Sequence, residues 1–148
     1  MEETKDFKRR VLFVCIHNAA RSQMAETFLN RLGGQYFAAE SAGLEPTKIN
    51  PLVADAMREI GIDISGATAR SVFDLFKKGN EYSYVITVCD EANQRCPLFP
   101  GRTRRIHWNF EDPAAFDGSY EERMEKIRKL RDEIKAKVEE FVRQFEAT

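Results

Sequence analysis

Cys15 and Arg21, with five residues between them, are the side chains of this sequence best suited to chemistry. Cys15 ends an apolar run that begins at Val11 and predicts a buried strand, whereas Arg21 falls in the first turn of a helix expected over 19–32. In a strand–loop–helix, backbone N–H groups and the positive end of the helix point at an anion. The same field favours a thiolate over a thiol. The segment therefore predicts a nucleophilic thiolate beside a site for a tetrahedral oxyanion.

The residues between and beside these two are expected to line the oxyanion site. The guanidinium of Arg21 offers a planar fork to two oxygen atoms, and Ser22 can donate a hydrogen bond to the thiolate. Asn18 suits a left-handed backbone that turns the loop amides inward, and His17 is either an electrostatic aid or an exposed residue at the rim. The alternative for Cys15 is a buried strand cysteine without a reaction. The expected oxyanion-binding set is Ile16, His17, Asn18, Ala19, Ala20, Arg21 and Ser22.

Two further cysteines, Cys89 and Cys96, are separated by six residues in a polar segment that is compatible with a helix. This spacing is too wide for a zinc knuckle or a C-x-x-C redox motif. Cys89 follows an expected strand, as Cys15 does, so the two thiols can approach one another. If the segment loops out, Cys96 can reach Cys89, and successive thiolate displacements on sulfur would connect all three thiols. The alternative is two unconnected cysteines, one buried and one in a loop.

Asp112 precedes Pro113 in a loop that follows an expected strand. Taken alone, this dipeptide is an ordinary turn signal. Facing an adduct between a thiolate and an oxyanion, however, Asp112 could protonate the leaving oxygen as a general acid. His107 and Trp108 are expected to end the preceding strand and to pack the wall of the site.

Alternating β-rich and helical patterns predict an α/β fold in a single domain, residues 1–148. The expected architecture is a four-stranded parallel sheet with helices on both faces, in which ligands bind beyond the carboxyl ends of the strands. Asn50 and Pro51 predict the start of a second helix, and Ser119 with Glu122 predicts a capping box for a long C-terminal helix. A further short helix is expected around Val72, Leu75 and Phe76. The expected strands are Val11–Val14, Tyr36–Glu40, Tyr84–Val88 and Arg105–Trp108.

Composition places the chain among ordinary globular proteins and excludes several classes. Apolar residues make up 43% and charged residues 32%, as is usual for globular proteins. The net charge of −1 shows no excess of basic residues of the kind that nucleic-acid binding requires. The basic cluster 102–105 is expected at a solvated strand edge or at the rim of an anion site. The charged first ten residues and the short apolar run after them predict neither a signal peptide nor a membrane span. Three cysteines and two histidines favour neither a static disulfide framework nor structural zinc. We therefore expect a cytoplasmic monomer without a metal or cofactor.

In combination, these motifs resemble the thioredoxin-coupled arsenate reductases, which are built on the low-molecular-weight protein tyrosine phosphatase fold. The resemblance covers nearly the whole chain, and the ordered set is highly specific. Its motifs are Val14-Cys15-x-x-Asn18-x-x-Arg21-Ser22-Gln23-Met24-Ala25-Glu26, Ser41-Ala42-Gly43, Gly61-Ile62-Asp63-Ile64-Ser65, Val88-Cys89 with Cys96-Pro97, and His107-Trp108-x-Phe110-x-Asp112-Pro113.

The resemblance also implies a role for each matched residue. It implies that Cys15 attacks arsenate, that Arg21 and the loop amides hold the oxyanion, and that Asp112 is the general acid. Cys89 would then displace arsenite and leave a disulfide with Cys15, and Cys96 would convert it into a Cys89–Cys96 disulfide for thioredoxin to reduce. Phosphate and sulfate would bind as analogues of arsenate, and no cofactor is implied. The catalytic set is then Cys15, Arg21, Ser22, Cys89, Cys96 and Asp112.

Two loop positions depart from the family pattern. His17 stands where the family often has glycine, and Ala20 stands where it often has a second loop cysteine. Neither change removes a group that the implied mechanism needs.

A cation site of some relatives is matched only in part. Those relatives bind potassium near the loop through an asparagine, a serine, a threonine and an aspartate. Asn18, Ser41 and Thr68 match as loop-supporting residues, but Arg70 occupies the acidic position. A cation there would meet a positive charge, so no bound potassium is expected. Arg70 then either stabilises the asparagine–serine network or points to solvent.

Two other functions fit part of the pattern. A low-molecular-weight phosphatase would use Cys15, Arg21 and Asp112 through a phosphocysteine intermediate. However, Ala114-Ala115 stand where such phosphatases typically carry aromatic residues, and the second cysteine pair would have no use. Weak phosphatase side activity is still expected, because arsenate and phosphate share shape and charge. A redox-regulated module that binds oxyanions without turnover would not need the intact catalytic set.

Overall fold

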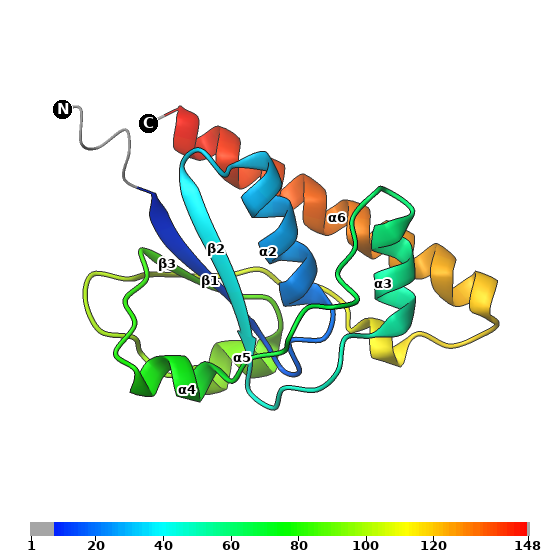
Figure 1. Ribbon diagram of the computed structural model, residues 1–148, viewed down its shortest axis with the longest axis horizontal. Coiled ribbons are helices and arrows are strands. Elements are labelled where there is room, and N and C mark those ends of the chain that lie inside the picture. The colour runs from blue at the N-terminus through cyan, green and yellow to red at the C-terminus, as the bar shows by residue number, and fades with distance from the viewer. Residues whose placement is uncertain (1–7, 148) are drawn as a thin grey trace.

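Four parallel strands form the centre of the protein in the computed structural model, which describes residues 8–147 (Figure 1). The strands lie in the order β2-β1-β3-β4, so the chain crosses over between neighbouring strands. This architecture confirms the expected α/β fold with a four-stranded parallel sheet. The ends of the expected 1–148 domain, residues 1–7 and 148, lie outside the described residues. The strand bounds are β1 Arg9–Cys15, β2 Phe37–Gly43, β3 Tyr84–Thr87 and β4 Arg104–His107.

Helices cover both faces of this sheet. The helices α2, α3 and α6 pack together on one side, and the short helices α4 and α5 lie on the other (Figure 1). Their bounds are α2 Arg21–Leu32, α3 Pro51–Arg58, α4 Val72–Lys77, α5 Asp90–Arg95 and α6 Tyr120–Glu146, with a 3₁₀ turn, η1, at Pro113–Ala115.

The starts of these helices follow local capping chemistry. The side chain of Asn50 accepts hydrogen bonds from the N–H groups of Leu52 and Val53 and caps α3, as its sequence predicts. Ser119 and Glu122 form the expected capping box at the start of α6. Helix α2 begins at Arg21, two residues later than expected, and Ala20 gives it no side-chain cap. Residues 16–20 therefore stay outside the helix, with their backbone groups available for other contacts.

The long helix α6 closes the core on one side of the sheet. Its buried side chains recur at helical spacing, and its aromatic residues pack on the strands, with the rings of Phe141 and Phe37 5.1 Å apart. The opposite side of the helix is charged. Across residues 8–147, no helix combines the length and the apolar character that crossing a membrane requires.

The parallel arrangement brings chemically active residues to one edge. Strand β1 ends at Cys15, β3 ends two residues before Cys89, and β4 ends shortly before Asp112. Because parallel strands share the direction of their carboxyl ends, all three residues lie at the same edge of the sheet. This edge is where the sequence places the site.

Candidate active site

The loop that follows β1 turns its carbonyl groups outward, and the segment 44–50 binds them. Backbone N–H groups of Leu44, Glu45, Thr47 and Asn50 donate to the carbonyl oxygens of Cys15, Ile16, His17 and Ala19, over N···O distances of 2.7–3.1 Å. In a trans peptide the C=O and the next N–H point in opposite directions. The loop N–H groups therefore turn toward the side of the loop where the thiols lie: the N–H of Asn18 donates to the Cys15 sulfur, and the N–H of Ile16 acts on Cys89.

The thiol of Cys15 lies at the end of β1, and the residue is 2% exposed. Its sulfur accepts a hydrogen bond from the backbone N–H of Asn18 at 3.1 Å and lies 2.9 Å from Oγ of Ser22. Ser22 Oγ also accepts a hydrogen bond from Nδ2 of Asn18 at 2.8 Å, which leaves its own hydrogen free to point at the sulfur. Both contacts direct hydrogen-bond donors at the Cys15 sulfur.

Asn18 holds the loop in shape from its centre. It has a φ of +53°, as the sequence predicts, and it is fully buried. Its Oδ1 accepts hydrogen bonds from the backbone N–H of Arg70 at 2.9 Å and from Nε2 of Gln23 at 3.2 Å. Gln23 Nε2 also donates to the Asn18 carbonyl at 3.1 Å. The sequence analysis did not predict that Gln23 binds Asn18. The position of Gln23 directly after Ser22 in the loop motif is the signal that could have indicated this contact.

Behind the loop, the end of β2 and helix α2 form a partly buried polar contact. Oγ of Ser41 donates to Oε1 of Glu26 at 2.6 Å, rather than to Asn18. Burial raises the pKa of the Glu26 carboxyl, whereas the Ser41 hydroxyl and the charge of Arg70 act in the opposite direction. Arg70 thus supports the loop through its backbone N–H, and its charge faces Glu26. Thr68 is exposed and lines a separate depression, so its supporting role stays a prediction.

Gly43 lies directly against the catalytic loop. A Cβ atom at this position would lie 2.7 Å from the carbonyl oxygen of Ile16 and 2.8 Å from the backbone nitrogen of Asn18. Both neighbours are backbone atoms, so any larger residue would displace the loop. The Ser41-Ala42-Gly43 motif therefore serves the site through close packing.

Arg21 connects the loop to the segment that carries Asp112. The guanidinium is buried, donates to the carbonyl of Phe110 at 3.0 Å, and lies 3.7 Å from Oδ2 of Asp112. The other carboxylate oxygen, Oδ1, accepts the N–H of Ala114 and caps the turn η1. Asp112 is therefore held at the wall of the cavity, beside the Arg21 guanidinium.

His17 stands at the rim of the loop and is half-buried. Its Nδ1 lies 3.0 Å from the carbonyl oxygen of Glu45. A carbonyl can only accept, so Nδ1 carries the hydrogen. The backbone contact holds the imidazole in place at the pocket wall.

Cys89 and Cys96 cap the two ends of helix α5 and carry free thiols, as Cys15 does. Burial raises the pKa of the Cys89 thiol; the N–H groups of Ala92 and Ile16 and the charge of Arg21 oppose this, and a charge on Cys15 adds to it. The pairing of β1 with β3, in which the N–H of Val88 donates to the Val14 carbonyl at 2.9 Å, places Cys89 beside the end of β1 and the loop that follows it.

Cys96 lies at the far end of α5 and is buried away from the loop. Burial raises the pKa of its thiol to about 11, against the charge of Arg105. Seven steps along a helix, the separation of Cys89 and Cys96, rise by about 10 Å, whereas a disulfide needs Cα atoms roughly 4.4–6.8 Å apart. Cys96 therefore reaches Cys89 only if α5 unwinds. Arg105 donates to the carbonyls of Cys96 and Asn93, so this member of the basic cluster 102–105 supports the end of α5.

A cavity of about 580 Å³ opens in front of Cys15. The loop, the segment 47–52, the Asp112 turn and the first turn of α6 contribute its walls. Its lining residues are Cys15, His17, Ala19, Ala20, Arg21, Thr47, Lys48, Ile49, Asn50, Pro51, Leu52, Asp112, Ala114 and Arg123. Within residues 8–147, no group of three or more His, Cys, Asp or Glu side chains gathers to hold a metal ion.

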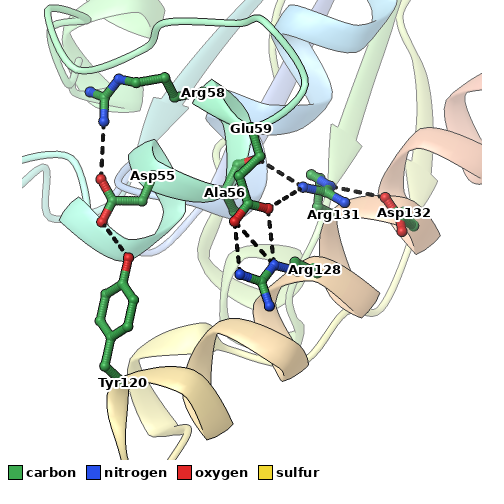
Figure 2. Close-up of polar contacts among 8 residues, drawn as sticks. All are labelled: Asp55, Ala56, Arg58, Glu59, Tyr120, Arg128, Arg131 and Asp132. Atoms are coloured by element: carbon green, nitrogen blue, oxygen red, sulfur yellow. Dashed lines mark hydrogen bonds and ion pairs between the residues drawn. The ribbon is translucent and has the colours of Figure 1, made fainter.

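A network of ion pairs joins α3, which forms one wall of this cavity, to α6 (Figure 2). Nε and Nη2 of Arg128 donate hydrogen bonds to the Glu59 carboxylate at 2.8–3.1 Å. The buried Arg131 donates to the carbonyl of Ala56 at 2.8 Å. Arg128, and then Arg131, lowers the pKa of the Glu59 carboxyl. Near the cavity, the hydroxyl of Tyr120 donates to Asp55 at 3.0 Å. The network fixes the position of α3 relative to the site.

The geometry matches that of a known family. The sequence pattern of the low molecular weight phosphotyrosine protein phosphatases matches residues 10–148. The chain belongs to this family. An arsenate reductase of Shouchella clausii is 40% identical over 135 residues, which cover 90% of this chain and 95% of that protein.

Solved structures show the same likeness. The arsenate reductase of Archaeoglobus fulgidus superposes with a TM-score of 0.70 at 32% identity and covers 89% of this chain and 98% of its own. A thioredoxin-dependent arsenate reductase of Corynebacterium glutamicum superposes with a TM-score of 0.62 at 29% identity, over 93% of this chain and 65% of that one. The resemblance to arsenate reductases of the phosphatase fold is thereby confirmed.

Proposed function

We propose that this protein reduces arsenate to arsenite through a Cys15–arsenate adduct and a relay of Cys15, Cys89 and Cys96 that thioredoxin regenerates. The observation that carries the proposal is the position of the Cys89 thiol next to the loop that holds Cys15, with Cys96 at the other end of the same short helix. A phosphatase has no use for this arrangement. The arsenate reductases among its relatives support the choice of oxyanion.

The first step joins arsenate to the enzyme. The oxyanion sits on the loop N–H groups and the Arg21 guanidinium, and the thiolate of Cys15 attacks arsenic. A bond forms between sulfur and arsenic, and one oxygen leaves as water after Asp112 supplies a proton. Ser22 and the N–H of Asn18 hold the thiolate until it reacts.

The second step reduces arsenic. The thiolate of Cys89 attacks the sulfur of Cys15, and the electron pair of the sulfur–arsenic bond stays on arsenic. Arsenic(V) becomes arsenic(III) and leaves as arsenite, while the two thiols lose two electrons in forming a disulfide. Burial raises the pKa of the Cys89 thiol, and the charge of Arg21 opposes that rise, so Arg21 assists the formation of the thiolate that this step needs.

The third step moves the disulfide away from the loop. Cys96 attacks Cys89, α5 unwinds, and Cys15 returns as a free thiolate. Thioredoxin then reduces the Cys89–Cys96 disulfide by the same exchange chemistry. The relay thus delivers the electrons of an external dithiol to a site that is too enclosed for that partner.

Disulfide mapping after one turnover tests the relay. The reduced protein receives one equivalent of arsenate without reductant, is alkylated, and is digested for mass spectrometry. We expect Cys89–Cys96 to accumulate with Cys15 free in the wild type, and Cys15–Cys89 to accumulate in Cys96→Ser. The control Cys89→Ser should form neither disulfide. The proposal fails if Cys96→Ser sustains multiple turnovers with thioredoxin, or if the wild type only hydrolyses phosphate esters.

A second activity is supported by the same loop. Cys15, Arg21 and Asp112 have the positions that a phosphatase of this family needs, and phosphate has the shape and charge of arsenate. Ala114 and Ala115 follow the Asp112–Pro113 pair and offer no aromatic ring to a phenyl group. We therefore propose phosphate ester hydrolysis as a weak side activity.

A further inference from the structure

The cavity in front of Cys15 is larger than the oxyanion that the loop holds. An oxyanion of five heavy atoms fills a few water volumes, on the order of 100 Å³. The cavity measures about 580 Å³, within the range of ~300–1,000 Å³ that is typical of sites for organic ligands. Inorganic arsenate therefore leaves most of this space unused.

Arg123 lines the same cavity from the first turn of α6. Among the buried side-chain nitrogen and oxygen atoms of residues 8–147, its Nε is the one without a hydrogen-bond partner. This Nε is closed to solvent, so a ligand acceptor satisfies it only by drawing the guanidinium toward the cavity, and that contact would relieve an unpaired buried donor. Arg21, by contrast, already donates to the Phe110 carbonyl and faces Asp112.

The charges of the lining point to the same class of ligand. Arg21, Lys48 and Arg123 contribute three positive charges, whereas Asp112 is the one carboxylate that lines the cavity. Neither Lys48 nor Arg123 forms an ion pair with a carboxylate of the described chain, residues 8–147. A single oxyanion on the loop leaves these two cations unmatched.

Part of the cavity wall is apolar. Ile49 and Leu52 contribute aliphatic side chains to the lining, and Ala114 adds a small one. Carbon atoms of a ligand could pack here without burying an unpaired polar group. The wall therefore suits a short carbon chain that joins two charged ends.

We propose that this cavity binds small organic phosphates that carry a second anionic group, a carboxylate or another phosphate. The phosphate lies on the loop beside Arg21, and the second group binds Arg123 with help from Lys48. The inference rests on the proposed function, because it uses the same oxyanion loop. Such compounds would compete with arsenate for the enzyme, and Arg123 would determine which of them bind.

Calorimetric titration of the reduced protein with two matched probes tests this site. 3-Phosphoglycerate and glycerol 3-phosphate share their length and phosphate group, and they differ in a carboxylate that replaces a hydroxymethyl group. We expect 3-phosphoglycerate to bind about tenfold more tightly, as one charge-assisted contact predicts. In Arg123→Gln this preference should fall to about twofold or less, with the affinity for glycerol 3-phosphate changed least. Arg123→Lys, which keeps the charge, should fall between.

Arg143→Gln is the matched control, since Arg143 is an exposed arginine of the same helix outside the cavity. It should leave the preference for 3-phosphoglycerate at its wild-type value. Equal binding of the two probes to the wild type would overturn the second-anion site. So would an equal loss for both probes in Arg123→Gln, because Arg123 would then act on the shared phosphate. Failure of the protein to bind inorganic phosphate or arsenate would refute the oxyanion loop itself, and with it the proposed function.

Discussion

The loop after β1 and the helix after β3 each bring a thiol to the carboxyl edge of the sheet, but different contacts hold them. In the loop and the first turn of α2, buried polar side chains bind one another, and Asn18, Ser22 and Gln23 are each less than 5% exposed. In α5, Ala92 is the one buried side chain among residues 90–95. The first segment is therefore fixed by buried contacts, whereas unwinding the second breaks the bonds from Arg105 to the carbonyls of Cys96 and Asn93 but uncovers, of its own side chains, only that of Ala92. A relay needs both properties in neighbouring segments.

Replacing Asn18, at the centre of the loop after β1, tests how rigidly that loop is held. Of the changes considered, it should have the largest effect. Asn18→Ala loses every side-chain hydrogen bond of Asn18 and keeps a left-handed backbone that alanine disfavours. We expect the free energy of unfolding to fall by ~2–4 kcal/mol. Asn18→Gly also loses these hydrogen bonds, but glycine adopts the left-handed backbone without strain. Its free energy of unfolding should therefore fall by ~1–2 kcal/mol less than that of Asn18→Ala. Urea denaturation of the three proteins measures both effects, and equal losses in the two variants would show that the backbone conformation carries no cost.

The pH dependence of the step in which Cys96 attacks Cys89 tests whether α5 unwinds before the exchange. Inside the folded protein, burial raises the pKa of Cys96 to about 11, so its thiolate is scarce at neutral pH. If α5 unwinds first, Cys96 becomes exposed and titrates near the usual thiol value of ~8.5. The rate of Cys89–Cys96 formation should therefore rise about tenfold per pH unit above pH 7 and level off near 8.5. Rapid alkylation at intervals after arsenate addition measures it; a rise that continues toward pH 11 would mean that Cys96 reacts from its buried position.

A smaller change in the same helix sharpens the comparison further. Gln94 lies in the middle of α5, and its side chain is exposed. At such a position glycine destabilises the helix by ~1 kcal/mol relative to alanine. If unwinding precedes the exchange, Gln94→Gly should form Cys89–Cys96 about fivefold faster than Gln94→Ala. The rate of Cys15–Cys89 formation should be the same in both, because that step needs no unwinding. Identical rates for both steps would separate the exchange from the stability of α5.

Sequence reasoning located the strand end and the turn of the candidate site because their signals are local. An apolar run that ends in Cys15 and an asparagine in the loop after it predict a strand end and a left-handed turn, and both are present. The parallel sheet then places Cys89 and Asp112 at the same edge. The start of α2 was predicted two residues too early, because the outward carbonyl contacts of the loop compete with helix formation.

Contacts between distant segments were beyond the reach of the sequence. The close approach of Gly43 to the loop and the bond from the Arg70 backbone to Asn18 depend on how two chain segments pack. The position of Arg123 in the cavity depends on the direction in which α6 leaves the Asp112 turn. A charged residue in the first turn of a helix is ordinarily a surface residue, so nothing local distinguished it.

The segment 44–50 gives the catalytic loop its shape through backbone atoms alone. Four of its N–H groups bind loop carbonyls, and none of these contacts depends on a side chain. These four contacts should therefore survive many side-chain changes in the segment, although Leu44 in the core, Asn50 at the start of α3, and Lys48 and Ile49 in the cavity lining have roles of their own. The segment should not accept a change in length, since one inserted residue would shift each donor past its acceptor and let the loop carbonyls turn inward. In this stretch the number of residues, more than their identity, is the inherited constraint.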